Sequence, residues 1–252
     1  MHPILFSFGP VRLYSYGFLV ALGVVSAIAY LRKQSAGIGV EPARVMDLAL
    51  LAVVSGFVGA RVFYVIQEWD YFIASPHQIL QLWEGGIVFY GGLLGGFLGF
   101  AAFVWAKRLS LLAMLDLFVP AVALAQGFGR IGCFLNGCCY GIPAHVPWSV
   151  QFPFLADRVH PVQLYEALFC WILAAVLFVL WSKRLRAGTV TGAYFILYPV
   201  GRFFFEFLRG DHAGLIWNLT LHQWVSLLVA AVGLVVLKQA LPHGNQTAPR
   251  SF

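Results

Sequence analysis

The sequence predicts an all-α, polytopic integral membrane protein with seven transmembrane helices. Of its 252 residues, 61% are hydrophobic and only 10% are charged, whereas soluble domains carry about 25% charged residues. The hydrophobic residues gather in seven runs, each close to the roughly 20 residues that a helix needs to cross the hydrocarbon core. These runs are residues 13–31, 45–66, 87–106, 111–131, 162–181, 189–208 and 219–237.

The seven runs fit a single membrane domain, residues 1–241, with no soluble domain between them. Two connections are longer than a turn. Residues 67–86 are rich in aromatic side chains and are expected to lie at the membrane interface. Residues 132–161 are rich in Gly, Pro and Cys and are expected to form an outer-side segment. Residues 242–252 are polar and are expected to form a disordered C-terminal tail.

Lys and Arg in the short connections predict the orientation of the chain. Basic residues follow the first, third, fifth and seventh runs, whereas residues 67–86 have none and residues 132–161 have only Arg158. The N-terminus is therefore expected outside and the C-terminus in the cytoplasm. Because the net charge of +6 comes from such scattered residues, it does not predict a nucleic-acid partner. The residues that set the orientation are Arg32, Lys33, Arg44, Lys107, Arg108, Lys183, Arg184, Arg186, Lys238 and Arg250.

Polar side chains within the runs fall at a common depth. At a rise of 1.5 Å per residue and in the predicted orientation, six of the runs place theirs toward the outer side of the membrane. Ionisable residues at such depths usually face a protein interior or a wet cavity. The sequence therefore predicts a polar cavity open toward the outer leaflet. The residues concerned are Tyr16, Arg61, Tyr90, Arg130, His160, Gln163, Glu166, Arg202, Glu206 and Arg209.

This predicted cavity carries more arginine than carboxylate. Arg202, Glu206 and Arg209 fall at i, i+4 and i+7, on one helix face, and Arg binds phosphate through paired hydrogen bonds. In the outer leaflet the simplest such anion is a phospholipid headgroup. Other readings stay open: a structural Arg202–Glu206 ion pair, an outward-reaching Arg61, and tyrosines of the interface belt. Asp47 and Asp116 are expected to serve helix ends, and the face formed by Gly91, Gly95 and Gly99 is expected to serve packing only.

One stretch, residues 127–141 (Gly-Phe-Gly-Arg-Ile-Gly-Cys-Phe-Leu-Asn-Gly-Cys-Cys-Tyr-Gly), joins an apolar run to a polar one. From Gly129 onward it resembles the signature of the prolipoprotein diacylglyceryl transferase family. Further segments resemble that family in the same order, so that the likeness covers nearly the whole chain. They are Tyr16-Gly17, Gly59-Ala60-Arg61, residues 85–92 (Gly-Gly-Ile-Val-Phe-Tyr-Gly-Gly), residues 160–166 (His-Pro-Val-Gln-Leu-Tyr-Glu), and Tyr198 followed by residues 202–209 (Arg-Phe-Phe-Phe-Glu-Phe-Leu-Arg).

The resemblance implies an activity: transfer of the diacylglyceryl group of phosphatidylglycerol to the lipobox cysteine thiol of a bacterial preprolipoprotein. The product is a thioether, and glycerol phosphate is released. The implied setting is the bacterial plasma membrane, among membrane lipids, and no cofactor or metal is expected. The implied catalytic residues are Arg130 and Arg202, which would stabilise the leaving phosphate, with Tyr90 and Tyr16. The implied substrate-binding residues are Arg61, Arg130, Gly141, His160, Gln163, Glu166, Tyr198, Arg202, Glu206 and Arg209.

Three positions depart from the usual residues of that family. Tyr90 stands where many members have a histidine that is a proposed base, Cys133 stands where asparagine is usual, and Cys138 where glutamate is usual. These changes leave two other functions open. One is a related membrane transferase or thiol-redox protein with a different acceptor, and the other is a lipid or anion transporter.

Three of the four cysteines, Cys133, Cys138 and Cys139, follow one another closely in the 127–141 stretch. In an oxidising compartment, Cys133 and Cys138 could form a disulfide. Free packing thiols, a nucleophile, or a metal site completed by His145 or His160 are the alternatives, although the spacing matches no standard zinc pattern. Cys170 lies inside an apolar run and is expected to be buried and inert.

Overall fold

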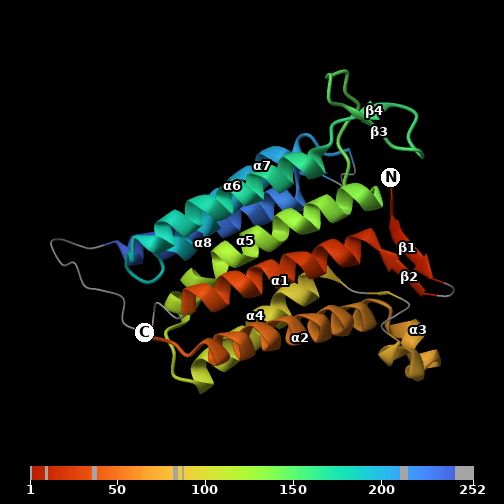
Figure 1. Ribbon diagram of the computed structural model, residues 1–252. Helices are drawn as coiled ribbons and strands as arrows, with labels where there is room; N and C mark the ends of the chain where they lie inside the picture. The colour runs from red at the N-terminus through yellow and green to blue at the C-terminus, as the bar shows by residue number, and fades with distance from the viewer. Residues whose placement is uncertain are drawn as a thin grey trace. The chain divides into compact units, whose positions relative to one another are not determined.

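The computed structural model describes residues 2–8, 11–35, 39–81, 85–86, 88–210 and 215–241 (Figure 1). The chain divides into two compact units, one made of Met1–Tyr30 with Leu115–Ser251 and the other of Leu31–Met114. The division falls within two long helices, α1 (Ser15–Ser35) and α5 (Leu111–Asn136). The predicted tail, residues 242–252, lies outside the described residues.

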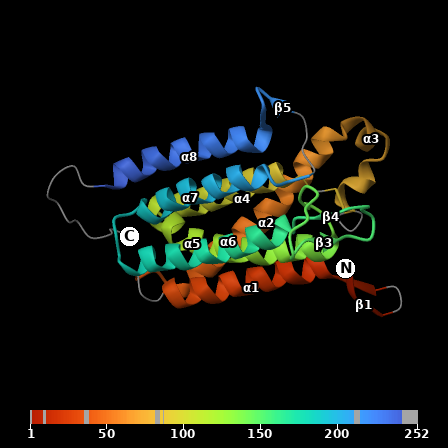
Figure 2. The same cartoon turned by 90° about the horizontal axis from the view of Figure 1, so that it is seen from above.

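The first unit holds most of α1 and α5 together with α6 (Val162–Ser182), α7 (Thr189–Glu206) and α8 (Leu221–Ala240). Helix α7 packs against both α6 and α8, and the two views in Figures 1 and 2 show these three helices together. Small residues allow close approach beside the polar site described below. Gly127 of α5 lies against the Trp171 ring of α6, and Gly201 of α7 lies against the Phe169 ring of α6.

The second unit is centred on α2 (Pro42–Gln67) packed against α4 (Phe89–Ala106). Between them come α3 (Trp69–Ala74) and a 3₁₀ helix, η2 (Pro76–Leu80). The α2–α4 contact depends on glycine, because a Cβ atom added at Gly59 would lie 2.8 Å from Cα of Gly95. Such small-residue faces let membrane helices approach closely, and the packing role expected for Gly91, Gly95 and Gly99 is confirmed.

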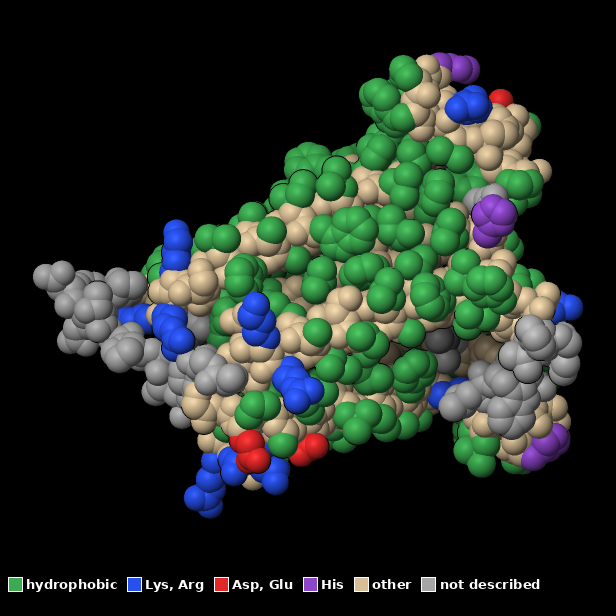
Figure 3. Space-filling model, viewed as in Figure 1, with side chains coloured by type: hydrophobic (Ala, Val, Ile, Leu, Met, Phe, Trp, Pro, Cys, Tyr) green, Lys and Arg blue, Asp and Glu red, His purple; other side chains and the backbone are tan. Residues whose placement is uncertain are grey.

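Six helices in the described part of the chain are long and apolar enough to cross a membrane: α1, α2, α4, α5, α6 and α8. Hydrophobic side chains cover much of the face shown in Figure 3. Val25, Leu50 and Leu228 lie on three different helices and are each more than 60% exposed, a surface that suits lipid rather than water. The remaining predicted run, residues 189–208, is also a helix, α7. It carries Arg202 and Glu206, and it is not among the six candidates.

The purely helical prediction missed three short antiparallel pairs: β1 (Ile4–Phe8) with β2 (Val11–Tyr14), β3 (Val150–Gln151) with β4 (Arg158–Val159), and β5 (Leu215–Ile216) with β6 (Leu219–Thr220). Two helix starts were consequently placed too early. Residues 13–14 lie in β2, and residues 219–220 lie in β6. Hydrophobic runs alone cannot separate a strand residue from the start of a helix.

Asp116, near the start of α5, is fully buried and caps the N-terminus of α7. Its carboxylate accepts hydrogen bonds from the backbone N–H of Gly188 at 2.9 Å, and from the backbone N–H and Oγ1 of Thr191 at 2.7 and 2.6 Å. A carboxylate satisfies the unpaired N–H groups of a helix N-terminus and interacts favourably with the helix dipole. This contact fixes where α7 begins, and therefore the level at which Arg202 lies.

We expect Asp116→Ala to destabilise the first unit by about 2–3 kcal/mol, because buried donors lose a charged acceptor. Asp116→Asn, which keeps one acceptor oxygen, should fall between this variant and the wild type. The measurement is the thermal unfolding midpoint of the purified protein in detergent. Asp47→Ala is the matched control, since Asp47 is exposed. An unfolding midpoint for Asp116→Ala equal to that of Asp47→Ala would contradict this role.

Candidate active site

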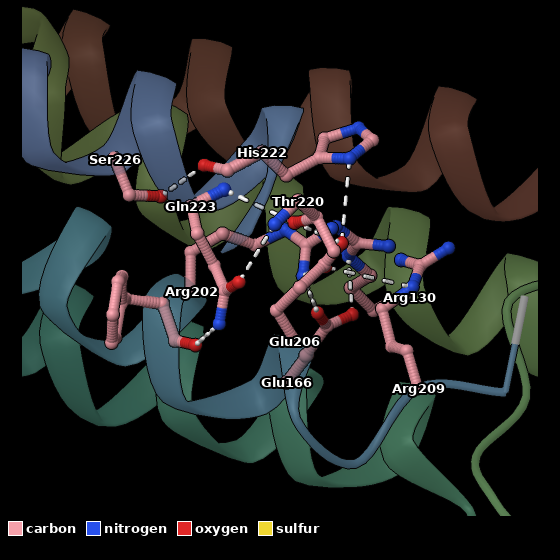
Figure 4. A network of polar contacts seen from close by, with 10 residues as sticks. Arg130, Glu166, Arg202, Glu206, Arg209, Thr220, His222, Gln223 and Ser226 are labelled. Carbon is pink, nitrogen blue, oxygen red and sulfur yellow. Dashed lines mark hydrogen bonds and ion pairs between the residues drawn. The ribbon is translucent and has the colours of Figure 1, made fainter. Parts of the chain in front are cut away.

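Three helices of the first unit each place one charged side chain at a common point. Glu166 Oε2 lies 2.9 Å from Nε of Arg130, and Glu166 Oε1 lies 3.6 Å from Nη1 of Arg202 (Figure 4). Arg130 comes from α5, Glu166 from α6 and Arg202 from α7. A single carboxylate thus joins two arginines that are 72 residues apart in the sequence (202 − 130).

Glu206, one helical turn beyond Arg202, is a second carboxylate that several polar side chains contact. Its Oε2 lies 2.5 Å from Nη1 of Arg202 and 4.0 Å from Nε of Arg209. Its Oε1 accepts a hydrogen bond from Oγ1 of Thr220 at 2.9 Å and lies 3.4 Å from Nδ1 of His222. Arg202 therefore contacts both carboxylates, and the start of α8 is tied to the same network (Figure 4).

The charges of this network are largely removed from water. The side chains of Glu166 and Glu206 are 4% and 3% exposed, those of Arg202 and Arg209 are 11% exposed, and that of Arg130 is 21% exposed. Within the described residues, both Glu166 oxygens and Nη1 of Arg202 have ion-pair contacts but no aligned hydrogen bond. Three guanidinium groups and two carboxylates leave one net positive charge, so the network can accept an anion.

A small pocket lies beside Arg130, Glu166 and Arg202. One part of its wall is polar and the other is apolar and aromatic, a combination typical of small-molecule sites. The lining residues are Arg130, Glu166, Phe169, Cys170, Tyr198, Arg202 and Phe205. Tyr198 stacks on Tyr194, with ring centroids 5.4 Å apart, and Tyr194 donates a hydrogen bond to Gln126 of α5 at 3.0 Å. The predicted pocket residue Tyr198 is thus placed beside Arg130 and Arg202.

The end of α5 folds the 127–141 stretch back on itself. Gly137 has a φ of +84°, which favours glycine, and the backbone N–H groups of Gly137 and Cys138 both donate to the carbonyl of Cys133, at 2.9 and 3.2 Å. The N–H of Gly137 also lies 3.3 Å from the carbonyl of Phe134, which completes a Schellman motif. Because the chain reverses here, Cys138 and Cys139 return to the side of Cys133.

Backbone pairing fixes the segment that follows. The N–H of Gly141 donates to the carbonyl of His160 at 3.0 Å, and the N–H of Ile142 donates to the carbonyl of Leu208 at 2.9 Å. Gln163, fully buried, donates from Nε2 to the carbonyl of Cys138 at 2.7 Å. Gly141, His160 and Gln163, predicted to bind substrate, therefore build the loop that lies beside Arg209.

Tyr16 lies next to the same stretch. Its ring packs against Gly132 of α5, and the side chain is close enough to interact electrostatically with Arg130 and with the cysteines that follow. His160 contacts Tyr165 through Nδ1 at 3.2 Å, and the Tyr165 hydroxyl accepts a hydrogen bond from Trp148 at 2.6 Å. The imidazole of His160 is therefore held in the loop layer by aromatic neighbours.

Arg61 and Tyr90 belong to the second unit, where the Arg61 side chain is surrounded by backbone carbonyl groups. It is 8% exposed and donates five hydrogen bonds to backbone carbonyls, those of Gln78, Ile79, Gln81, Gly85 and Gly86, at 2.6 to 3.3 Å. These bonds use the five donors of a guanidinium, so the geometry favours loop anchoring over ligand binding. Tyr90 is 40% exposed near the start of α4.

All four cysteines are free thiols, so the structure does not contain the disulfide considered for Cys133 and Cys138. Cys170 is buried in α6, as expected. Hydrogen bonding with Cys133 and Cys138 lowers the pKa of Cys139, and the positive charges of Arg209 and Arg130 act in the same direction.

Thr220 and His222 are site residues that were not predicted from the sequence. Thr220 also caps α8: its Oγ1 accepts from the N–H of Gln223 at 3.3 Å, while Oε1 of Gln223 accepts from the N–H of Thr220 at 2.9 Å. The Thr-x-x-Gln spacing of a capping box is visible in the sequence and would have placed the start of α8. Nothing in that spacing indicates that the same hydroxyl reaches Glu206.

The membrane-length helices and the pocket lined by Arg130 and Arg202 define a multi-pass membrane protein with a positively charged pocket among its helices. Comparisons with known proteins give its family. The family model for prolipoprotein diacylglyceryl transferase matches residues 3–238. The chain therefore belongs to the prolipoprotein diacylglyceryl transferase family and is a transferase.

Curated relatives from the same family match this chain over most of their length. A phosphatidylglycerol–prolipoprotein diacylglyceryl transferase of Clostridium tetani is 39% identical over 243 residues, which is 94% of this chain and 96% of that protein. A second such enzyme, from Clostridium perfringens, is 36% identical over 89% of this chain and 90% of its own. The corresponding protein of Staphylococcus haemolyticus is 33% identical over 93% of this chain and 86% of its own.

We expect Glu206→Ala to destabilise the protein by about 3–5 kcal/mol, because it leaves buried arginines without their counter-charge. Glu206→Gln should cost less, since the amide oxygen can still accept from Thr220. Thermal unfolding in detergent measures both variants. The control is Glu41→Ala, which removes an ion pair with Arg44 in which the Glu41 side chain is 64% exposed and which should contribute about 1 kcal/mol or less. Equal unfolding midpoints for Glu206→Ala and Glu41→Ala would contradict the structural role of Glu206.

Proposed function

We propose that this protein transfers the diacylglyceryl group of phosphatidylglycerol to the cysteine thiol of a preprolipoprotein lipobox. The product is a thioether, with glycerol phosphate released. The proposal rests on the family and on the activity for which relatives that match most of the chain are named. The observation that carries it at the level of chemistry is the pocket in which Arg130 and Arg202 share Glu166.

Arg130 and Arg202 are the proposed ligands of the phosphate. Arg130 contacts Glu166 through Nε, and a guanidinium carries four further donors on its terminal nitrogens. Glu166 holds the two guanidinium groups apart and oriented, so that little rearrangement is required when the phosphate binds. The apolar wall formed by Phe169 and Phe205 suits the lipid part of the substrate.

The proposed reaction is a displacement at the glyceryl carbon that carries the phosphate. The acceptor thiolate forms the C–S bond, the C–O bond to phosphate breaks, and its electron pair leaves with the glycerol phosphate. Negative charge therefore grows on the phosphate oxygen in the transition state. Preorganised donors aimed at developing charge lower such barriers in water-excluded sites, and this is the role we assign to Arg130 and Arg202.

The remaining residues are proposed to support this site. Glu206 orients Arg202 and Arg209; Gly141, His160 and Gln163 hold the neighbouring loop; and Tyr16 and Tyr198 provide phenolic hydroxyls toward the substrates. Tyr90, in the second unit, stays a predicted catalytic residue. We retain seven spans by adding α7 to the six candidate helices. The charges of the site interrupt the apolar length of α7. We also retain an outer N-terminus, a cytoplasmic C-terminus and a bacterial plasma membrane as the location.

Arg130→Ala and Arg202→Ala should each lower the rate of thioether formation by about 100- to 1,000-fold, as expected when one donor to a developing oxyanion is lost. Purified protein would be incubated with phosphatidylglycerol and a cysteine-containing lipobox peptide, and the product measured by mass spectrometry. Lys substitutions keep the charge but not the paired hydrogen bonds, so they should recover only part of the activity. Arg44→Ala, an exposed arginine in α2, is the control. Full activity of either alanine variant would overturn the phosphate role, and no product from the wild type would overturn the function.

A further inference from the structure

Three thiols meet beside the arginine network without a role in the proposed phosphate chemistry. The Sγ atoms of Cys133, Cys138 and Cys139 all lie within 4.8 Å of one another, and each cysteine is partly accessible. In the described part of the chain this group contains no histidine or carboxylate. The histidines considered from the sequence, His145 and His160, are not members.

The fold around α5 produces this cluster. The turn at Gly137 brings Cys138 back so that its N–H bonds the carbonyl of Cys133, and Cys139 follows with a φ of +63°, a left-handed conformation that is uncommon outside glycine. Gln163 then anchors the carbonyl of Cys138 from α6. A backbone hydrogen bond within the turn and a side-chain hydrogen bond from Gln163 therefore hold the segment that carries the three thiols.

The dimensions suit a single thiophilic ion. Zinc binds thiolate sulfur at about 2.3 Å in a tetrahedron, which sets neighbouring sulfurs at about 3.8 Å. The three sulfurs lie within about 1 Å of that spacing, so side-chain rotation alone could close the site. Thiolates are the soft ligands that select zinc or Cu(I) over magnesium or calcium. Arg209 and Arg130 act electrostatically on Cys139, and their positive charges would offset part of the charge of three thiolates.

We propose that Cys133, Cys138 and Cys139 bind one zinc ion through three thiolates, and that the fourth position takes the thiol of the acceptor cysteine. A zinc site with three protein ligands and one open position is the arrangement that zinc enzymes use for chemistry, whereas structural sites are closed by four. The second part of the proposal rests on the proposed function, because it is the transferase reaction that requires an acceptor thiol beside Arg130.

The ion would supply a means of deprotonating the acceptor thiol. A thiol that coordinates zinc loses its proton, which passes to water, and the bound thiolate sulfur forms the C–S bond. The C–O bond to phosphate breaks and its electron pair leaves with glycerol phosphate. No oxidant or reductant is required, and the zinc remains on its three cysteines after the thioether product dissociates.

The test begins with metal binding and does not depend on activity. Reduced, metal-stripped wild-type protein in detergent is titrated with cobalt(II), which occupies zinc sites and gives sulfur-to-metal charge-transfer absorption. We expect one cobalt per chain, displaced by one zinc. Cys133→Ser, Cys138→Ser and Cys139→Ser should each lose the one-to-one binding, whereas Cys170→Ala, the matched variant of the fourth cysteine, should keep it. Unfolding midpoints identify any variant that fails to fold, and the wild-type titration stands without the variants.

The acceptor part is tested on the cobalt-loaded protein. A lipobox peptide with its cysteine should change the charge-transfer band, and the same peptide with serine should not. The metal site is overturned if the reduced wild type binds no stoichiometric cobalt, or if all three serine variants keep the one-to-one binding. An unchanged band with the cysteine peptide, or full transferase activity after metal removal, overturns the acceptor role. Metal bound one-to-one without any thioether product from phosphatidylglycerol overturns the proposed function and leaves the metal site standing.

Discussion

The site depends on the cost of burying charge. Glu166 and Glu206 are almost fully excluded from solvent, and each is stable there only because arginines from other positions lie against it. Removing two ions from water costs several kcal/mol per ion, and the cost is recovered only when the partners are held at short distance. The helices that carry Arg130, Glu166 and Arg202 must therefore keep one register, and the start of α8 must supply Thr220 to Glu206.

Other contacts in the first unit maintain that register. Asp116 fixes the start of α7 four turns before Arg202, and glycines at positions 127 and 201 let α5 and α7 approach the aromatic rings of α6. The loop after α5 is tied to the end of α7 by backbone hydrogen bonds. The arginines are consequently positioned before any ligand arrives, which is what electrostatic stabilisation of a leaving phosphate requires.

The same loop also carries the thiol cluster of Cys133, Cys138 and Cys139. The reversal at Gly137 that brings the backbone toward Arg209 also gathers three thiols. The arginine network that we propose to bind phosphate and the thiol cluster thus share one segment, and they match the two partners of the proposed reaction, a phospholipid and a cysteine. Two of the three positions that are expected to depart from the usual residues of the family, Cys133 and Cys138, lie in this segment.

Hydropathy alone located the seven long helices of this protein, although not the starts of α1 and α8, because each membrane helix must satisfy its own backbone in lipid and shows this as a long apolar run. The arginines and carboxylates of the site were also evident from the sequence, since ionisable residues within such runs are too costly to be incidental. Only the tertiary structure decided their partners. The structure joins Arg130 to Arg202 through Glu166. It shows that Arg61 donates to backbone carbonyls, and that Thr220 and His222 contact Glu206. It also brings Cys133, Cys138 and Cys139 together. These contacts depend on helix register and on the turn at Gly137, and neither can be predicted from a run of hydrophobic residues.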